Sequence, residues 1–154
     1  MNINVRTNIS KEFDDNLEIV INASEYTKEV ENILQILQQV TSAKINSIVG
    51  RNGNEIAIID VNDIIKFYSS EKYNYCKTKK GEFTIKQKLY ELEETLPTDN
   101  FIRISNSCIV NIKYIECFDL GIIGNILVKF KDGSTENVSK RKVSEVMRFL
   151  KERR

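Results

Sequence analysis

Three short turn motifs, each set between strand-like runs, constrain the fold of this chain more than any other feature. The motifs are Asn52-Gly53, Lys80-Gly81 and Asp132-Gly133, and Gly-containing pairs of this kind favour tight hairpins. The flanking runs have the residue types of β-strands: residues 47–49 before 55–59, 73–77 before 83–85, and 125–130 before 135–138. From about Lys44 onward, we therefore expect a chain that is built mainly from antiparallel hairpins.

Two short helices interrupt this β pattern. Leu89, Leu92 and Leu96 follow near-helical spacing, and Pro97 ends that segment. Ser139 is a good N-cap for a final helix, whose apolar face is formed by Val143, Val146, Met147 and Leu150. Residues 101–104 and 108–112 predict further short strands. The expected fold class is α+β, mainly β, with an antiparallel sheet and short helices.

The first 43 residues predict a separate β-β-α extension. Residues 3–5 and 17–21 alternate like strands, and a helix follows with Asn22 and Ser24 as candidate N-caps. Its apolar stripe needs a partner and consists of Val30, Ile33, Leu34, Leu37 and Val40. Because two strands alone are a marginal partner, we expect this extension to serve in assembly or partner contact, or to pack on the β domain of residues 44–154.

The residue types that are missing exclude much catalytic chemistry. The chain has no histidine, which rules out His-based acid–base catalysis and His-ligated metals. Cys76, Cys108 and Cys117 lack CxxC spacing, so structural thiols are expected and a redox sensor is the minor alternative. No apolar run approaches the roughly eighteen residues that cross a bilayer. These features favour a cytoplasmic protein that is not an enzyme and has no cofactor or metal.

Charge is distributed unevenly along the chain. Residues 1–42 carry a net charge of −4, whereas residues 101–154 carry +5. Within the latter segment, Lys140, Arg141 and Lys142 follow the expected cap Ser139 directly, although a helix N-terminus disfavours cations. Backbone N–H groups, a hydroxyl and three cations together suit a phosphate. The alternative is a basic turn that only faces solvent.

Several separated blocks resemble the LytTR family of DNA-binding domains. The central block, residues 101–111 (FIRISNSCIVN), is similar to the family motif F-x-R-x-H-[RKN]-S-x-[IV]-V-N. The other blocks appear in the order that the family shows: residues 63–68 (DIIKFY), 72–75 (KYNY), 89–97 (LYELEETLP), 131–134 (KDGS) and 138–141 (VSKR). The resemblance covers roughly residues 44–152. It implies a β fold that reads DNA with loops instead of a recognition helix.

The resemblance also implies which residues contact DNA. Asn74, Asn106 and Arg141 fall at the positions from which three loops reach bases in successive major grooves. Their chemistry agrees, because Asn can pair with adenine and Arg with guanine through two hydrogen bonds. Phosphate contacts are implied for a second set of residues: Arg103, Ser107, Lys113, Ser139, Lys140 and Lys142. As an alternative to phosphate contact, Arg103 could brace its strand. As an alternative to base contact, Asn74 and Asn106 could have purely structural roles in their turns.

The chain departs from the family at two points. Ser105 stands where the family often has His, and about 43 residues precede the domain, too few for a phosphorylatable receiver. The sequence is more similar to small stand-alone LytTR regulators, in which the segment 118–120 (FDL) recurs. Such regulators imply a homodimer, or two copies on promoter direct repeats of double-stranded DNA, and a small membrane-protein modulator.

The leading hypothesis is therefore a sequence-specific DNA-binding transcriptional regulator. The alternative is a protein–protein adaptor whose basic C-terminal face contacts an acidic partner or a membrane surface. Both are electrostatic, so salt dependence does not separate them, whereas selectivity for a DNA sequence does.

Overall fold

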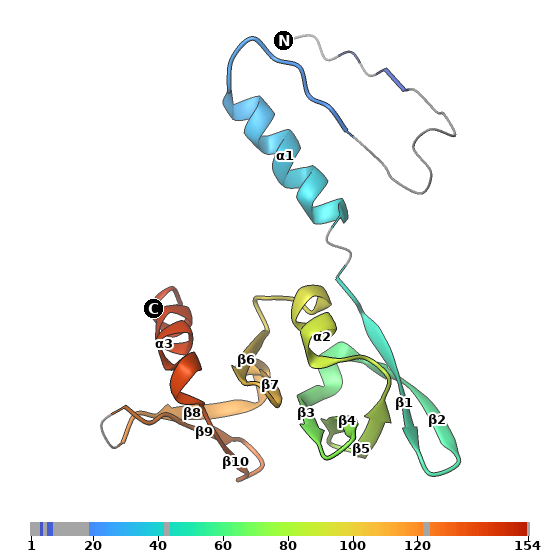
Figure 1. Ribbon diagram of the computed structural model, residues 1–154, viewed down its shortest axis with the longest axis vertical. Helices are drawn as coiled ribbons and strands as arrows, with labels where there is room; N and C mark the ends of the chain where they lie inside the picture. The colour runs from blue at the N-terminus through green and yellow to red at the C-terminus, as the bar shows by residue number, and fades with distance from the viewer. Residues whose placement is uncertain (1–3, 5, 8–18, 42–43, 122–123, 154) are drawn as a thin grey trace. The chain divides into compact units, whose positions relative to one another are not determined.

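The computed structural model describes residues 4, 6–7, 19–41, 44–121 and 124–153. The chain divides into two compact units, residues 1–41 and 42–154 (Figure 1). No helix in the described ranges is both long enough and apolar enough to cross a membrane.

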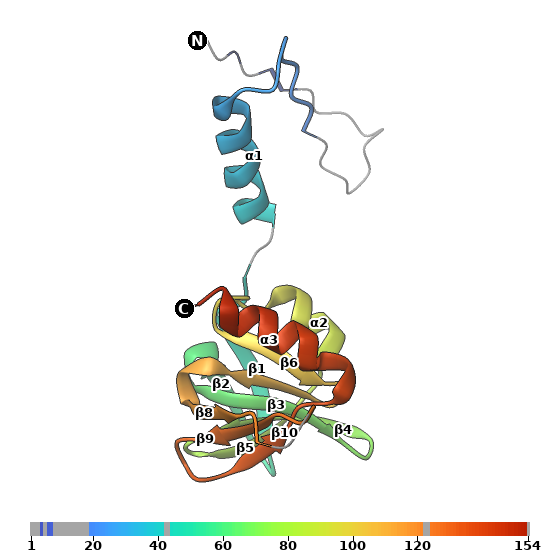
Figure 2. The same cartoon turned by 90° about the vertical axis from the view of Figure 1, so that its left-hand side faces the viewer.

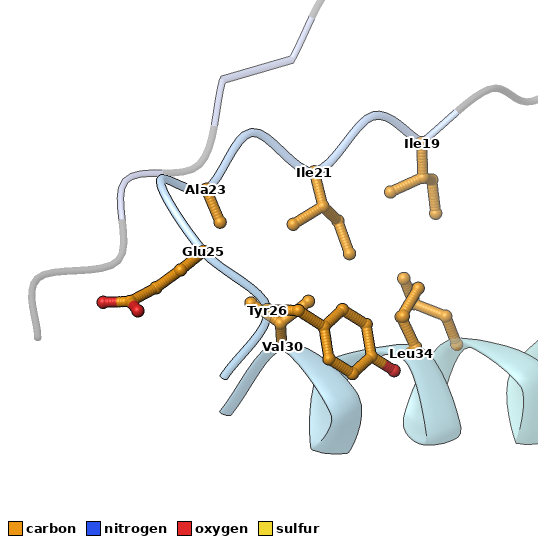
Figure 3. Close-up of a pocket in the computed structure, with 8 residues that line it drawn as sticks. Ile19, Ile21, Ala23, Glu25, Tyr26, Val30 and Leu34 are labelled. Atoms are coloured by element: carbon orange, nitrogen blue, oxygen red, sulfur yellow. The ribbon is translucent and has the colours of Figure 1, made fainter. Parts of the chain in front are cut away.

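The N-terminal unit contains one helix, α1 (Lys28–Thr41). Its first turn is capped by Thr27, whose hydroxyl lies 3.5 Å from the Val30 amide, so the predicted caps Asn22 and Ser24 are wrong. Val30 is buried, and the segment before the helix runs along the apolar stripe, with Ile21 over Val30 and Leu34 (Figure 3).

The two strands expected before α1 are only partly open to comparison. Residues 3, 5 and 17–18 lie outside the described residues, whereas residues 19–21 are described and form no strand. In place of a ribbon, this segment is an extended stretch that lines a hollow against the helix (Figure 3).

The second unit is built on a seven-stranded antiparallel sheet with the order β2-β1-β5-β4-β3-β7-β6. Its strands are β1 (Ser47–Asn52), β2 (Glu55–Asp60), β3 (Ile64–Ser70), β4 (Tyr73–Thr78), β5 (Gly81–Ile85), β6 (Phe101–Ser105) and β7 (Cys108–Asn111). The hairpins predicted for β1–β2 and β4–β5 are confirmed, and the sequence reading missed β3.

A second, three-stranded sheet has the order β10-β9-β8. It consists of β8 (Ile115–Asp119), β9 (Leu127–Phe130) and β10 (Thr135–Asn137), and the predicted β9–β10 hairpin is confirmed. Helices α2 (Leu89–Thr95) and α3 (Val143–Lys151) complete the domain, with short 3₁₀ turns η2 (Val61–Asp63), η3 (Ile112–Tyr114) and η4 (Lys140–Lys142).

The large sheet is covered on both faces. On one side, Phe67 and Ile109 pack with Leu92 of α2 and with Leu96, which directly follows that helix. On the other side, Val110 packs against the small sheet and α3 in a separate apolar cluster. Figure 1 shows these layers, with α3 and β8–β10 on the left and α2 on the right, and Figure 2 shows α3 lying across β6. Neighbouring residues of β7 therefore face opposite cores, which explains why all four are buried.

The tight turns have the backbone that their residues allow. Gly53 and Gly133 adopt φ of 58° and 86°, in the left-handed region that glycine enters without a Cβ penalty. The β3–β4 hairpin, which has no glycine, places Glu71 at φ 54° between Ser70 and Tyr73. This turn lacks the usual sequence signal, and it was not predicted.

Candidate nucleic-acid interface

One end of the large sheet brings together the β3–β4 hairpin and the β6–β7 turn. Asn74 in β4 lies opposite Ser69 in β3, and the Ser69 amide donates to the Ser107 carbonyl at 2.9 Å. Because adjacent strands lie about 5 Å apart, this ladder places Asn74 roughly 10 Å from the backbone of the β6–β7 turn. Asn74 and the β6–β7 turn therefore lie at the same end of the sheet.

The Asn74 side chain is already engaged within the protein. Its Nδ2 donates to the Gln87 carbonyl at 3.0 Å, and the residue is half-buried in β4, not part of a loop. The bond ties the start of β4 to the segment that leads into α2. Asn74 retains one amide hydrogen and its carbonyl oxygen for another partner. Its position is thus compatible with DNA contact, and the same bond favours the structural alternative.

The β6–β7 turn exposes Asn106 and Ser107. Arg103 fixes the backbone of this turn, since Nε donates to the Ser105 carbonyl at 3.0 Å and an Nη donates to the Asn106 carbonyl at 2.7 Å. The Asn106 side chain itself makes no hydrogen bond within the described part of the chain. The turn therefore holds a free amide group on a braced backbone, which is the arrangement that base reading requires.

Arg103 has a third partner in Glu93 of α2. The other Nη donates to Glu93 Oε2 at 2.7 Å, and the Arg103 side chain is only 16% exposed. With three acceptors around its guanidinium, Arg103 braces the turn. This arrangement favours the bracing alternative over the phosphate contact that the resemblance implies. No local pattern predicts the contact with Glu93, because Glu93 and Arg103 come from different elements.

The three basic residues 140–142 form the 3₁₀ turn η4, and the α-helix begins only at Val143. The expectation that they form the first turn of the final α-helix is therefore wrong. Ser139 has the extended backbone of an N-cap, but its side chain makes no capping bond. Its amide donates to the Ile104 carbonyl at 2.9 Å, which fastens η4 beside the end of β6. The basic turn and the β6–β7 turn are thus neighbours.

The cations of η4 differ in what they contact. Lys142 is paired with Glu145 at 2.9 Å and lies 3.8 Å from Glu93. Lys140 and Arg141 are exposed, and no described residue forms a hydrogen bond or an ion pair with either side chain. Of the three predicted cations, these two are therefore available to an anion without breaking an existing contact.

Lys113 lies apart from the other predicted contact residues. It belongs to η3, which follows the opposite end of β7, and it lies 5.9 Å from the centre of the Tyr114 ring. The four residues of β7 alone span about 13 Å. The structure therefore brings Asn106, Ser107, Ser139, Lys140 and Arg141 together and leaves Lys113 at the far end of the domain.

Buried groups lie directly behind the β6–β7 turn. Tyr68 in β3 pairs with Cys108 in β7, and its ring stacks on Tyr75 with the ring centres 5.1 Å apart. Burial raises the pKa of the Tyr68 hydroxyl to about 12 and the pKa of the Cys108 thiol to about 12. Burial likewise raises the pKa of Cys76 to about 11. Thiols in this state are poor nucleophiles, which favours the structural interpretation over redox sensing for these two cysteines.

The second unit of the protein is thus a β domain that exposes polar and basic groups on two braced turns, the β6–β7 turn and η4. Such groups suit an anionic partner. Residues 54–151 match the model of the LytTr DNA-binding domain family, and this is well over half of the chain. The protein therefore belongs to the LytTR family, and the resemblance inferred from its motifs is confirmed.

Relatives in Staphylococcus aureus are similar over nearly the whole chain. An uncharacterized HTH-type transcriptional regulator of strain NCTC 8325 / PS 47 is 35% identical over 143 residues, covering 87% of this chain and 97% of the relative. Another from strain MRSA252 is 33% identical over 153 residues, covering 99% and 96%. The similarity thus extends into the N-terminal unit.

A solved structure shows the same fold. It is the LytTr DNA-binding domain of a Bacillus cereus protein described as a methyl-accepting/DNA response regulator. It superposes with a TM-score of 0.67 at 23% identity and covers 69% of this chain and 97% of that domain. The expected mainly β fold class is confirmed. In the described ranges strands separate α2 from α3, so the helix-turn-helix in the relatives' names has no counterpart there.

These findings support the predicted class, a DNA-binding transcription regulator, and do not favour the adaptor alternative.

Proposed function

We propose that this regulator binds promoter DNA sequence-specifically and reads bases with Asn106 and Arg141. One observation carries the proposal: both side chains are exposed and unpaired within the described residues, whereas the turns that bear them are fixed to β6. Arg103 of β6 holds the Asn106 carbonyl, and the Ile104 carbonyl of β6 holds the amide of Ser139, next to η4. Asn and Arg are the side chains that can form two hydrogen bonds to adenine and guanine in the major groove.

Asn74 is the third proposed base contact. Its bond to Gln87 leaves one donor and one acceptor, which is the pair that adenine requires. If DNA does engage it, the contact forms without breaking the β4–α2 connection. We expect Asn74→Ala to affect stability as well as binding, in contrast to Asn106→Ala.

Phosphate contacts are proposed for the exposed hydroxyl and ammonium groups beside the base readers. Ser107 and Lys140 are exposed, and the Ser139 hydroxyl makes no capping bond. Such contacts set the position of the protein on the duplex without reading sequence. Arg103 and Lys142 are held by carboxylates, so they contribute less than the sequence implies.

Assembly is proposed to involve the N-terminal unit. Its net charge of −4 makes it a poor DNA surface, and Ile36 of α1 is 59% exposed. We propose a homodimer, or two copies on direct repeats, acting in the bacterial cytoplasm where the DNA lies. A small membrane protein remains the proposed modulator, on family resemblance alone. Light scattering of the full chain over a range of concentrations tests the homodimer.

The experiment that tests the DNA proposal is selection of binding sites from a library of random-sequence duplexes at physiological salt with excess competitor. An enriched sequence, bound more weakly by Asn106→Ala and Arg141→Ala by about 1–3 kcal/mol each, is the expected result. If the wild-type protein enriches no sequence, the proposal fails. If it enriches one that both variants bind equally well, the assignment of base readers fails.

A further inference from the structure

An acidic side chain contacts two of the predicted phosphate-binding residues. Glu93, on α2, contacts Arg103 through Oε2 at 2.7 Å and lies 3.8 Å from Lys142 through Oε1. It thereby links α2 to β6 and, more loosely, to η4. A carboxylate at this place repels DNA phosphates, so its contribution to binding cannot be an attraction for DNA.

Glu93 is one of three acceptors that hold the Arg103 guanidinium, and among them it is the one that carries a charge. Arg103 donates to the Ser105 and Asn106 carbonyls and to Glu93, and its side chain is 16% exposed, against 40% for Glu93. Without the carboxylate, the guanidinium loses the one charged partner that it has among the described residues. Phosphate would then be the strongest acceptor within its reach, since Arg pairs with phosphate through two parallel bonds. The Asn106 carbonyl would lose a fixed donor in that exchange.

The next residue provides a matched comparison. Glu94 is exposed on the same helix, and no described residue forms a hydrogen bond or an ion pair with its carboxylate. Glu93 and Glu94 thus place the same charge on the same element, and only Glu93 touches the β6–β7 brace. Any effect of charge alone is shared by the two positions, whereas an effect of positioning belongs to Glu93.

We propose that Glu93 is a positioning residue that keeps Arg103 on the β6–β7 turn and away from phosphates, so that it sharpens sequence discrimination at the expense of overall DNA affinity. The inference rests on the proposed function of Asn106 as a base reader. It gives an acidic residue an indirect role in specificity, which is to hold Arg103 on the β6–β7 turn that bears Asn106.

The test compares Glu93→Gln with Glu94→Gln on the sequence enriched by the wild-type protein and on a scrambled duplex of the same composition. For Glu93→Gln we expect the scrambled duplex to bind about threefold more tightly and the enriched one about threefold to tenfold more weakly, within the range that one base contact contributes. The plot of log affinity against log salt for the scrambled duplex should steepen by about one phosphate contact, because Arg103 is released.

For Glu94→Gln we expect both duplexes to gain equally and the salt dependence to stay unchanged. Arg103→Lys is the second variant, since it keeps the charge and cannot form all three bonds, and it should lose discrimination as well. Circular dichroism shows whether each variant is folded. If Glu93→Gln does not fold, the discrimination measured for Arg103→Lys tests whether the bonds of Arg103 are needed for specificity. Equal behaviour of Glu93→Gln and Glu94→Gln overturns the inference while leaving the proposed function intact. A wild-type protein that enriches no sequence removes both.

Discussion

The two ends of the large sheet both carry lysines or arginines, and they use them differently. At the reading end, defined here as the β6–β7 turn with η4, Arg141 and Lys140 are exposed and unpaired in the described structure, and Asn106 accompanies them. At the far end, Lys79 and Lys113 lie 5.6 Å and 5.9 Å from the centre of the Tyr114 ring. Positive charge alone therefore does not distinguish the ends.

Both ends are braced, and they differ in which side-chain groups are left free among the described residues. Arg103 and the Ser139–Ile104 bond fix the turns of the reading end. At the far end, the Tyr114 hydroxyl donates to the Asn62 carbonyl at 2.9 Å, so the aromatic ring is fixed and the lysines rest on it. Within the described residues, the first end holds a free amide and a free guanidinium on fixed turns, and these are the groups proposed to read bases. The far end is suited at most to phosphate contact.

The largest predicted effect concerns the buried thiols of Cys108 and Cys76. Burial raises the pKa of Cys108 from 9.0 to about 12 and that of Cys76 to about 11, so the unfolded chain releases these protons first as pH rises. Stability is then fully present below about pH 9 and is lost as pH climbs toward the folded pKa values. We expect a loss on the order of 1 kcal/mol per thiol for each pH unit in this window.

Urea unfolding at a series of pH values from 7 to about 11 measures this loss, with Cys108→Ala as the comparison. The variant should be less stable at neutral pH and should show a shallower decline above about pH 9. A wild-type stability that does not change across this range would contradict the buried, protonated state of both thiols.

The second prediction concerns the proposed base contact of Arg141. Arg141→Ala should weaken binding to the enriched duplex by about 1–3 kcal/mol and should relax the preference at one base pair. Arg141→Lys is the control, since it keeps the charge and loses the two-pronged geometry, and it should restore binding to scrambled DNA only. Fluorescence anisotropy with both duplexes measures this. A full rescue by Lys would mean that Arg141 contacts phosphate.

The parts of the fold that the sequence predicts are those set by local pattern. The β1–β2, β4–β5 and β9–β10 hairpins each have a glycine turn between strand-like runs, and α2 has leucines at helical spacing. In contrast, β3 is apolar on both faces, so Ile64, Ile65 and Phe67 show no alternation that would mark a strand. The strand order depends on contacts between distant segments, which no local pattern encodes.

The candidate site divides in the same way. Asn106 and Arg141 were chosen because family motifs mark their positions; the structure leaves both exposed, and their contact with bases stays a prediction. Bracing by Arg103 was an alternative in the sequence analysis, but its partners could not be predicted, since they come from α2 and from the turn after β6. Glu93 and Glu94 are indistinguishable in sequence as a solvated helix face. Only the folded arrangement brings one of them against a guanidinium.

A smaller effect is predicted for the far end. Lys79→Ala combined with Lys113→Ala should weaken binding to enriched and scrambled duplexes by the same factor, with a total of no more than about 1 kcal/mol. Phosphate contacts carry no sequence information, and any such contact that is lost reduces the salt dependence accordingly. Binding titrations at several salt concentrations measure both quantities. A loss confined to the enriched duplex would mean that the far end reads sequence too, and would contradict the proposed difference between the two ends.

The smallest effect is predicted for the ion pair at the β9–β10 turn. Lys77 Nζ lies 3.6 Å from Asp132 Oδ2, whereas the same carboxylate accepts from the Ser134 amide at 2.8 Å and from its hydroxyl. The hydrogen bonds from Ser134 are the main reason that the pKa of Asp132 is lowered, and Lys77 contributes less. Lys77→Ala should therefore cost less than about 0.5 kcal/mol of stability, as exposed ion pairs do. Asp132→Ala should cost more, because the turn loses its acceptor. Urea unfolding of the two variants decides this, and equal losses would show that the ion pair, not the turn, stabilises this corner.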